Sequence, residues 1–204
     1  MDFNLNEQQR ALKETARKFA EKELIDVAKE IEKNDTPPGK DILKRFSELG
    51  FLGVNLPTEY GGAGLSHFEA VLVLEEIAKV SIAVAFPIFE SSFGPAIAIS
   101  SFAENELKHA VLPKVCSGEM VIAVSMSEPN AGSALTDLTT KAEILGDKVV
   151  LNGQKRWCSG AGHADAYVVY SRMSEEKGAK GIGAVLLEKN SIDLYATVKS
   201  LYLQ

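Results

Sequence analysis

The sequence has 204 residues, a net charge of −6 at pH 7, and 46% hydrophobic and 25% charged residues, which is typical of a globular protein. It contains no cluster of Lys and Arg, so we expect no nucleic-acid partner, because binding to phosphates needs basic patches. The two cysteines and three histidines lack ligand spacing, so we expect neither a disulfide framework nor a metal site. The N-terminus lacks a basic stretch followed by an apolar one, which favours the cytoplasm, or the mitochondrial matrix in a eukaryote.

The first segment predicts one long amphipathic helix. Asn4 and Glu7 have the spacing of a capping box, in which two side chains satisfy the first free backbone N–H groups. Apolar residues then recur at helical spacing from Leu12 to Ile31. The helix is expected to end before the sequence NDTPPG, because proline and glycine interrupt it there.

Further helices are predicted as far as residue 115. The next one spans 41–49, and Ser66 with Glu69 forms a capping pair that opens another. Residues 81–102 are apolar over the length of a membrane span. They include one glutamate, two prolines and five serines, so we expect a buried, interrupted helix and no membrane partner. A last helix is expected at 104–115.

After residue 119 the pattern changes to short strands that are separated by turns. The predicted strands span residues 139–145, 148–151, 154–159, 166–172 and 181–188. Asn152–Gly153 is the strongest hairpin motif. We therefore predict an α+β protein, with an all-α helical domain at 1–119 followed by an incomplete antiparallel β-barrel-like or β-sandwich domain at 120–204.

Two segments of the second half could bind a flat ligand. Residues 124–137, VSMSEPNAGSALTD, combine hydroxyl side chains with turn residues and free backbone groups, which suits a heterocycle rich in carbonyls and ring nitrogens. Trp157, on the following predicted strand, could cover one face, with Ser159 on the same side. An ordinary turn and a core tryptophan are the plainer interpretation of these residues alone.

Four segments in this order make the chain similar to the acyl-CoA dehydrogenase flavoprotein family from about residue 3 to 189. They are LGFLGVNLPTEYGGAGLS at 49–66, ELKHAVLPKVCSGE at 106–119, MSEPNAGS at 126–133 and NGQKRWCSGAG at 152–162. The resemblance implies an FAD-dependent oxidoreductase of fatty acid metabolism that removes hydrogen from the α and β carbons of an acyl-CoA thioester. It also implies hydride transfer to flavin N5, an electron-transferring flavoprotein as electron acceptor, and a homo-oligomer, either tetramer or dimer.

The resemblance also implies which residues bind ligands. Those that would contact FAD are Val124, Ser125, Met126, Ser127, Ser133, Trp157, Cys158 and Ser159. Among them, the Ser127 hydroxyl would meet the flavin pyrimidine ring, Trp157 would lie against the flavin, and Ser159 would approach N5. Ser133 would also approach the coenzyme A part of the substrate. Glu90 would lie near the acyl tail, or it could be a paired structural charge.

The chain departs from the family in two ways. The family's catalytic glutamate lies in a C-terminal helical domain that this sequence does not contain, so we assign no catalytic residue and expect a fragment. Glu128, the nearest carboxylate of the motif, has a structural place in the resemblance, and Ala134 replaces a common acidic residue. Two alternatives remain open: a non-catalytic flavin- or acyl-CoA-binding assembly module, and a related flavin oxidase or monooxygenase.

Overall fold

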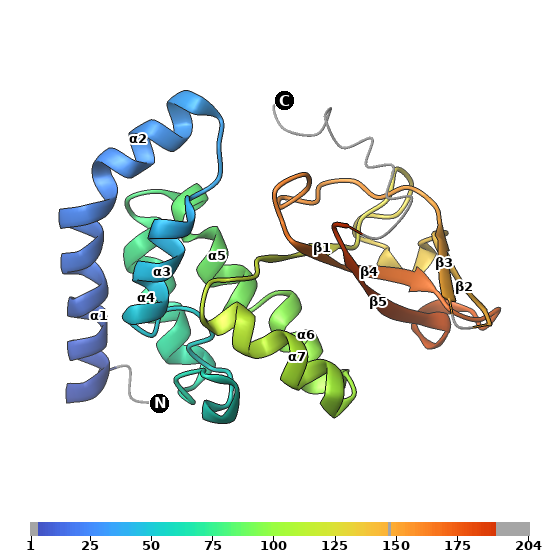
Figure 1. The fold of residues 1–204 in the computed structure, drawn as a ribbon, viewed down its shortest axis with the longest axis horizontal. Helices are drawn as coiled ribbons and strands as arrows, with labels where there is room; N and C mark the ends of the chain where they lie inside the picture. The colour runs from blue at the N-terminus through green and yellow to red at the C-terminus, as the bar shows by residue number, and fades with distance from the viewer. Residues whose placement is uncertain (1–3, 147, 191–204) are drawn as a thin grey trace. The chain divides into compact units, whose positions relative to one another are not determined.

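The computed structural model describes residues 4–146 and 148–190 and divides the chain into two units (Figure 1). The first unit, Met1–Val121, is helical, and the second, Ile122–Gln204, contains the strands. This arrangement confirms the α+β fold class. The division follows Val121, two residues after the domain boundary that the sequence predicts.

The first helix is long, as predicted, but it contains a π-helical segment and begins later than expected. Helix α1 spans Glu7–Phe19, the π-helix spans Ala20–Leu24, and α2 spans Ile25–Asn34. The capping box is formed by Asn6 and Gln9: the Asn6 N–H donates to Gln9 Oε1 at 3.0 Å and the Gln9 N–H donates to Asn6 Oδ1 at 2.8 Å. The predicted Asn4–Glu7 box is wrong. Both pairs have the same three-residue spacing, so the sequence motif does not determine which one caps the helix.

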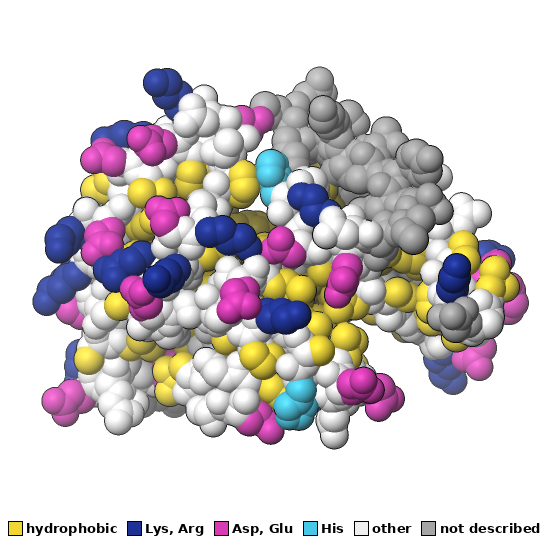
Figure 2. All heavy atoms as spheres, in the orientation of Figure 1, with side chains coloured by type: hydrophobic (Ala, Val, Ile, Leu, Met, Phe, Trp, Pro, Cys, Tyr) yellow, Lys and Arg dark blue, Asp and Glu magenta, His cyan; other side chains and the backbone are white. Residues whose placement is uncertain are grey.

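The other helices agree closely with the prediction. They are α3 at Lys40–Glu48, α4 at His67–Ala78, α5 at Ile82–Ser92, α6 at Pro95–Phe102 and α7 at Asn105–Cys116, with a short 3-10 helix at Thr58–Tyr60. The predicted Ser66–Glu69 capping box is present at the start of α4. Acidic and basic side chains are interspersed over the face of the helical unit seen in Figure 2.

The core of the helical unit forms around three aromatic rings. Phe19 lies edge-on to Phe46 and Phe51, with ring centroids 5.9 and 6.1 Å apart. Phe46 and Phe51 are fully buried, and burial of such a side chain contributes about 1.5–3 kcal/mol to folding. The long amphipathic helix is therefore held by the apolar face that its periodicity predicts.

The apolar segment at 82–102 is an interrupted helix, as predicted. It breaks between α5 and α6 at Phe93 and Gly94. On length and composition it could cross a membrane, but half of its most apolar stretch is buried within the protein. Val84, Ala85 and Ile88 belong to the core of the helical unit, as expected for a core helix.

The second unit contains a five-stranded mixed sheet. Its strands are β1 at Ile122–Ser125, β2 at Lys141–Leu145, β3 at Lys148–Asn152, β4 at Ala166–Arg172 and β5 at Ile182–Glu188. Strand β4 pairs with β5 in antiparallel orientation and with β1 in parallel orientation. The expected purely antiparallel sheet is thus wrong, because alternation of side chains indicates a strand but not the direction of its partner.

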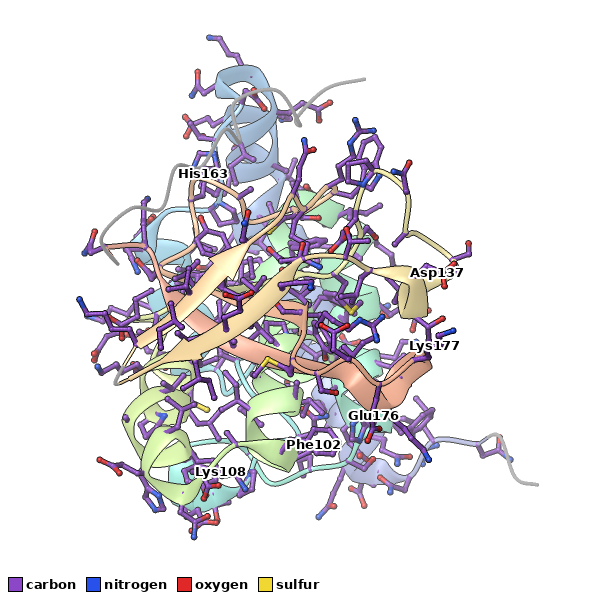
Figure 3. The ribbon with its side chains drawn as sticks, turned by 90° about the vertical axis from the view of Figure 1, so that its right-hand side faces the viewer. Phe102, Lys108, Asp137, His163, Glu176 and Lys177 are labelled. Atoms are coloured by element: carbon purple, nitrogen blue, oxygen red, sulfur yellow. The ribbon has the colours of Figure 1, made fainter. Side chains whose placement is uncertain are left out.

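Arg172 fixes one end of this sheet. Its guanidinium donates hydrogen bonds to the carbonyl oxygens of Thr136 at 2.6 Å, Gly178 at 2.9 Å and Glu176 at 3.0 Å. These bonds join the 3-10 helix at Leu135–Asp137 to the connection between β4 and β5. Figure 3 shows Asp137, Glu176 and Lys177 at this end, with His163 at the other.

Two sequence predictions about residues 152–159 are wrong. The hairpin turn between β2 and β3 lies at Gly146 and not at Asn152–Gly153. Residues 154–159 form an irregular segment and not a strand. Gly153 instead allows a close approach, since a Cβ atom there would lie 2.6 Å from Thr140 Cα. The glycine that resembles a hairpin residue therefore serves tertiary packing.

The substitution Gly153→Ala is expected to lower the free energy of unfolding by about 1–3 kcal/mol, because the new methyl group has to displace the Thr140 backbone. Denaturant unfolding followed by circular dichroism measures the change. Gly132→Ala is the control, because an added Cβ there meets no atom within 4 Å. Equal stability of the two variants would show that the close approach at Gly153 is dispensable.

Candidate functional site

The two segments that the sequence analysis selects lie side by side within the β unit. The Arg156 backbone N–H donates to the Ser127 carbonyl oxygen at 2.7 Å. The Ser125 hydroxyl donates to Cys158 Sγ at 3.1 Å. Residues 125–127 and 156–158 therefore run in opposite directions along each other, although they form no regular strand pair.

Glu128 connects these segments to a third one. Its side chain is 4% exposed and accepts four hydrogen bonds. Thr139 donates its backbone N–H at 2.7 Å and its hydroxyl at 2.8 Å, and the Thr140 N–H donates at 2.9 Å. Lys155 completes the set with an ion pair at 2.9 Å. A buried carboxylate needs such partners, because an unpaired buried charge is strongly unfavourable.

The environment of Glu128 keeps its carboxylate ionised. Burial alone would raise the pKa of Glu128, but the hydrogen bonds from Thr139, Thr140 and Lys155 outweigh burial and lower the pKa to about 2. The Lys155 ammonium also donates to the Met126 carbonyl oxygen at 3.0 Å. Lys155 thus contacts both the side chain and the backbone of the neighbouring segment. A carboxylate bound in this way is unsuited to act as a general base.

Trp157 is exposed and has an uncommon backbone conformation. The φ angle of Trp157 is 62°, in the left-handed region, and 66% of the residue's surface is exposed to solvent. The alternative of a core tryptophan is therefore wrong. Bulky residues rarely adopt this conformation, and where they do, the surroundings enforce it, often at functional sites.

The other predicted FAD contacts fall into two groups. Ser125 and Cys158 are buried and bound to each other, so they can offer a ligand only their backbone. Val124 and Met126 are half-buried, as is Ser127, whereas Ser133 and Ser159 are exposed. Within 4–146 and 148–190 the hydroxyls of Ser127, Ser133 and Ser159 have no hydrogen-bond partner. Because 154–159 is not a strand, strand alternation does not place Ser159 and Trp157 on one side.

Glu90 lies in the helical unit and is only 5% exposed. Burial raises the pKa of Glu90 to about 8, so the acid is largely neutral at pH 7. Its Oε2 atom has no hydrogen-bond partner in the described part of the chain, so the structure shows no pairing of Glu90 as a structural charge. The neighbouring Ser91, by contrast, has a partner, because its hydroxyl oxygen accepts a hydrogen bond from the Gly53 N–H at 3.1 Å.

Sequence reasoning missed the roles of Lys155, Thr139 and Thr140. The available indication was a carboxylate in a turn-rich segment with a lysine in the next motif, but their contact depends on tertiary structure. Among the described residues, no group of three or more His, Cys, Asp or Glu side chains could hold a metal ion. The site therefore combines an exposed indole, three hydroxyls without a partner among the described residues, and the Glu128–Lys155 ion pair.

Two family models match this chain. They describe the N-terminal domain of acyl-CoA dehydrogenase, matched by residues 6–119, and its middle domain, matched by residues 123–197.

Three known proteins show the extent of the similarity. Mitochondrial isovaleryl-CoA dehydrogenase of Pongo abelii is 38% identical over 91% of this chain and 44% of its own length. A chain from a structure named for the electron transferring flavoprotein of Acidaminococcus fermentans is 35% identical, with a TM-score of 0.85 over 93% of this chain and 50% of that one. The FAD complex of PigA is 27% identical, with a TM-score of 0.86 over 94% and 50%. This chain spans about half the length of the relatives it matches.

The Glu128 network predicts an acid-sensitive β unit. The pKa of Glu128 is about 2 in the folded state, below its ordinary value of 4.5. The stabilisation that its carboxylate adds to the free energy of unfolding is therefore complete above pH 4.5 and is lost as the pH falls toward 2. At about 1.4 kcal/mol for each unit by which the pKa is lowered, this stabilisation amounts to about 3 kcal/mol. Urea unfolding at several pH values should show that Glu128→Gln removes this part of the acid dependence. The exposed Glu143→Gln is the control, and identical acid profiles of wild type and Glu128→Gln would contradict the assignment.

Glu90 predicts the opposite pH dependence. Burial raises the pKa of Glu90 from 4.5 to about 8. The stabilisation that the neutral acid adds to the free energy of unfolding is therefore complete below pH 4.5 and is lost as the pH rises toward 8. Glu90→Gln should therefore stabilise the protein relative to wild type at pH 8.5, by up to about 5 kcal/mol, and much less at pH 4.5. Urea unfolding at both pH values measures the difference. A constant difference between the two proteins would show that Glu90 titrates normally.

Proposed function

The chain belongs to the acyl-CoA dehydrogenase family, and we propose that it provides the flavin-contacting part of an FAD-dependent dehydrogenase that acts on an acyl-CoA thioester. The observation that carries this proposal is the exposed, left-handed Trp157 beside the segment 125–128. An indole that is held out of the core offers a flat apolar face to a flat ring.

The residues of the site suit a flavin. Besides the exposed indole, the β unit offers three hydroxyls that have no protein partner within the described chain, those of Ser127, Ser133 and Ser159. Ser127 is bound through its carbonyl oxygen to Arg156, next to Trp157, and Ser159 follows Trp157 by two residues. An isoalloxazine ring needs this combination, because its faces are apolar while its edge carries carbonyl and nitrogen acceptors. The FAD complex of PigA, which shares the fold, supports the choice of FAD.

Each residue has a distinct proposed role. Trp157 covers one face of the flavin and excludes water from it. The hydroxyl of Ser127 donates to the pyrimidine edge of the ring, and that of Ser159 approaches N5. The backbone of Val124, Ser125, Met126 and Cys158 completes the FAD contacts. When bound, FAD accepts the β-hydrogen of the acyl group as hydride.

The substrate side of the proposal rests on Ser133 and Glu90. Ser133 is exposed, so its hydroxyl is available to the coenzyme A part of an acyl-CoA. Glu90, neutral and without a hydrogen-bond partner in the described residues, can donate or accept a hydrogen bond near the acyl tail without placing a charge there. The isovaleryl-CoA dehydrogenase relative supports an acyl-CoA as the substrate class.

We assign no catalytic base among these residues. Removal of the α-proton needs a carboxylate that is free to accept it. Glu128 accepts four hydrogen bonds, and its pKa of about 2 makes it a poor proton acceptor. Its place in the site is therefore to support the neighbouring residues.

We further propose an electron-transferring flavoprotein as electron acceptor and a homo-oligomeric state. The first is supported by the similar chain from the structure named for such a flavoprotein. We also propose a location in the mitochondrial matrix in a eukaryote, which the mitochondrial relative supports, and in the cytoplasm otherwise.

The single tryptophan provides a direct assay, because all indole emission comes from Trp157. Addition of FAD is expected to quench this emission saturably, since the flavin would lie against the ring. Trp157→Ala should weaken FAD binding, measured by equilibrium dialysis, by about tenfold or more, because it removes the stacking face. Phe102→Ala is the control, because Phe102 is 89% exposed and lies in the other unit.

Anaerobic addition of acyl-CoA to the FAD-loaded protein then separates the alternatives. Bleaching of the flavin band supports the dehydrogenase, whereas binding without bleaching is expected both of a non-catalytic module and of a flavin-contacting part without its base. In a separate aerobic experiment, oxygen consumption by the FAD-loaded protein favours an oxidase or monooxygenase. Absence of saturable quenching by FAD would contradict the flavin site itself.

A further inference from the structure

The conformation of Trp157 needs a physical cause. A non-glycine residue in the left-handed region costs about 1–2 kcal/mol. Burial of the indole does not offset this cost, because the residue is 66% exposed. Such a conformation persists only where the surrounding structure enforces it. The cause must therefore lie in the residues on either side of Trp157.

The chain is attached to one neighbouring segment on both sides of Trp157. Before it, Arg156 donates its N–H to the Ser127 carbonyl oxygen at 2.7 Å. After it, Cys158 accepts the hydroxyl of Ser125 at 3.1 Å. Gly160 then approaches β1 so closely that a Cβ atom would lie 2.5 Å from Ala123 Cβ. The residues flanking Trp157 are thus tied to a single stretch, 123–127.

Lys155 provides the strongest of these attachments. Its side chain is only 12% exposed and its ammonium binds both Glu128, at 2.9 Å, and the Met126 carbonyl oxygen, at 3.0 Å. Glu128 is itself bound to the backbone N–H groups of Thr139 and Thr140. The lysine is therefore anchored to a carboxylate that cannot move without breaking other bonds. Buried pairs of this kind can select one conformation even where they add little net stability.

We propose that the Glu128–Lys155 ion pair is a positioning pair, which holds Trp157 in its left-handed, solvent-facing conformation before any ligand binds. This inference rests on the proposed flavin site and adds a cause for its geometry. A ring that is already ordered loses less conformational freedom on binding, so preorganisation increases the affinity for FAD.

The pair is tested on the intact chain with the variants Glu128→Gln and Lys155→Met. The anisotropy of Trp157 emission without FAD reports the order of the ring, and FAD titration of each variant reports affinity. Both variants are expected to lower the anisotropy and to weaken FAD binding by about tenfold, at a temperature where circular dichroism shows them folded. Lys155→Arg keeps the charge and is expected to restore wild-type values.

The matched control is Lys141→Met, which removes an exposed ion pair of the same unit, between Lys141 and Glu175 at 3.5 Å. It should change neither quantity. Unchanged anisotropy and affinity in Glu128→Gln or Lys155→Met, even with a lower melting temperature, would reduce the pair to a stabilising role and overturn the proposal. If Lys155→Met does not fold, Glu128→Gln decides, because glutamine keeps the shape of the side chain.

The two proposals can fail separately. Without FAD binding by the wild type, the flavin proposal fails, while the anisotropy still reports whether the pair orders Trp157. With FAD binding that is equal in wild type and both variants, the flavin proposal stands and the positioning pair is refuted.

Discussion

The buried carboxylate of Glu128 is the constraint on which the candidate site depends. A charge that is 4% exposed has to find partners within the protein, and its four hydrogen bonds come from Thr139, Thr140 and Lys155. These partners belong to two segments that are distant from Glu128 in sequence. Satisfying one carboxylate therefore brings three parts of the β unit together, and residues 125–127 and 156–158, which we assign to FAD, lie beside this junction.

This constraint also explains why the site can hold an unfavourable backbone conformation. Trp157 follows directly after Lys155 and Arg156, both of which contact the segment 126–128. The contacts fix the path of the chain at this point, and the left-handed φ angle of 62° follows from that path. The exposure of the indole, and with it the proposed stacking face, is thus a consequence of a polar interaction in the interior.

Local sequence patterns predicted much of the fold but little of this junction. The Ser66–Glu69 cap, the interrupted helix at 82–102 and strand β4 at 166–172 follow from residue spacing, which is a local property. The π-helix at 20–24, the parallel pairing of β1 with β4 and the irregular course of 154–159 depend on contacts distant in sequence. Residue types alone selected the segment 124–137 with Trp157 and Ser159, and family resemblance assigned the FAD contacts, whereas the exposure of Trp157 and the isolation of Glu90 required the structure.

The most direct test of this account is the hydrogen exchange rate of the Arg156 amide, measured residue by residue by nuclear magnetic resonance. This amide lies in an irregular segment and donates to the Ser127 carbonyl oxygen at 2.7 Å. We expect slow exchange, comparable to amides of β4, in the wild type and much faster exchange after loss of the Glu128 carboxylate. Exchange in the wild type at the rate of an unstructured peptide would show that the two segments are not joined, and would contradict the account.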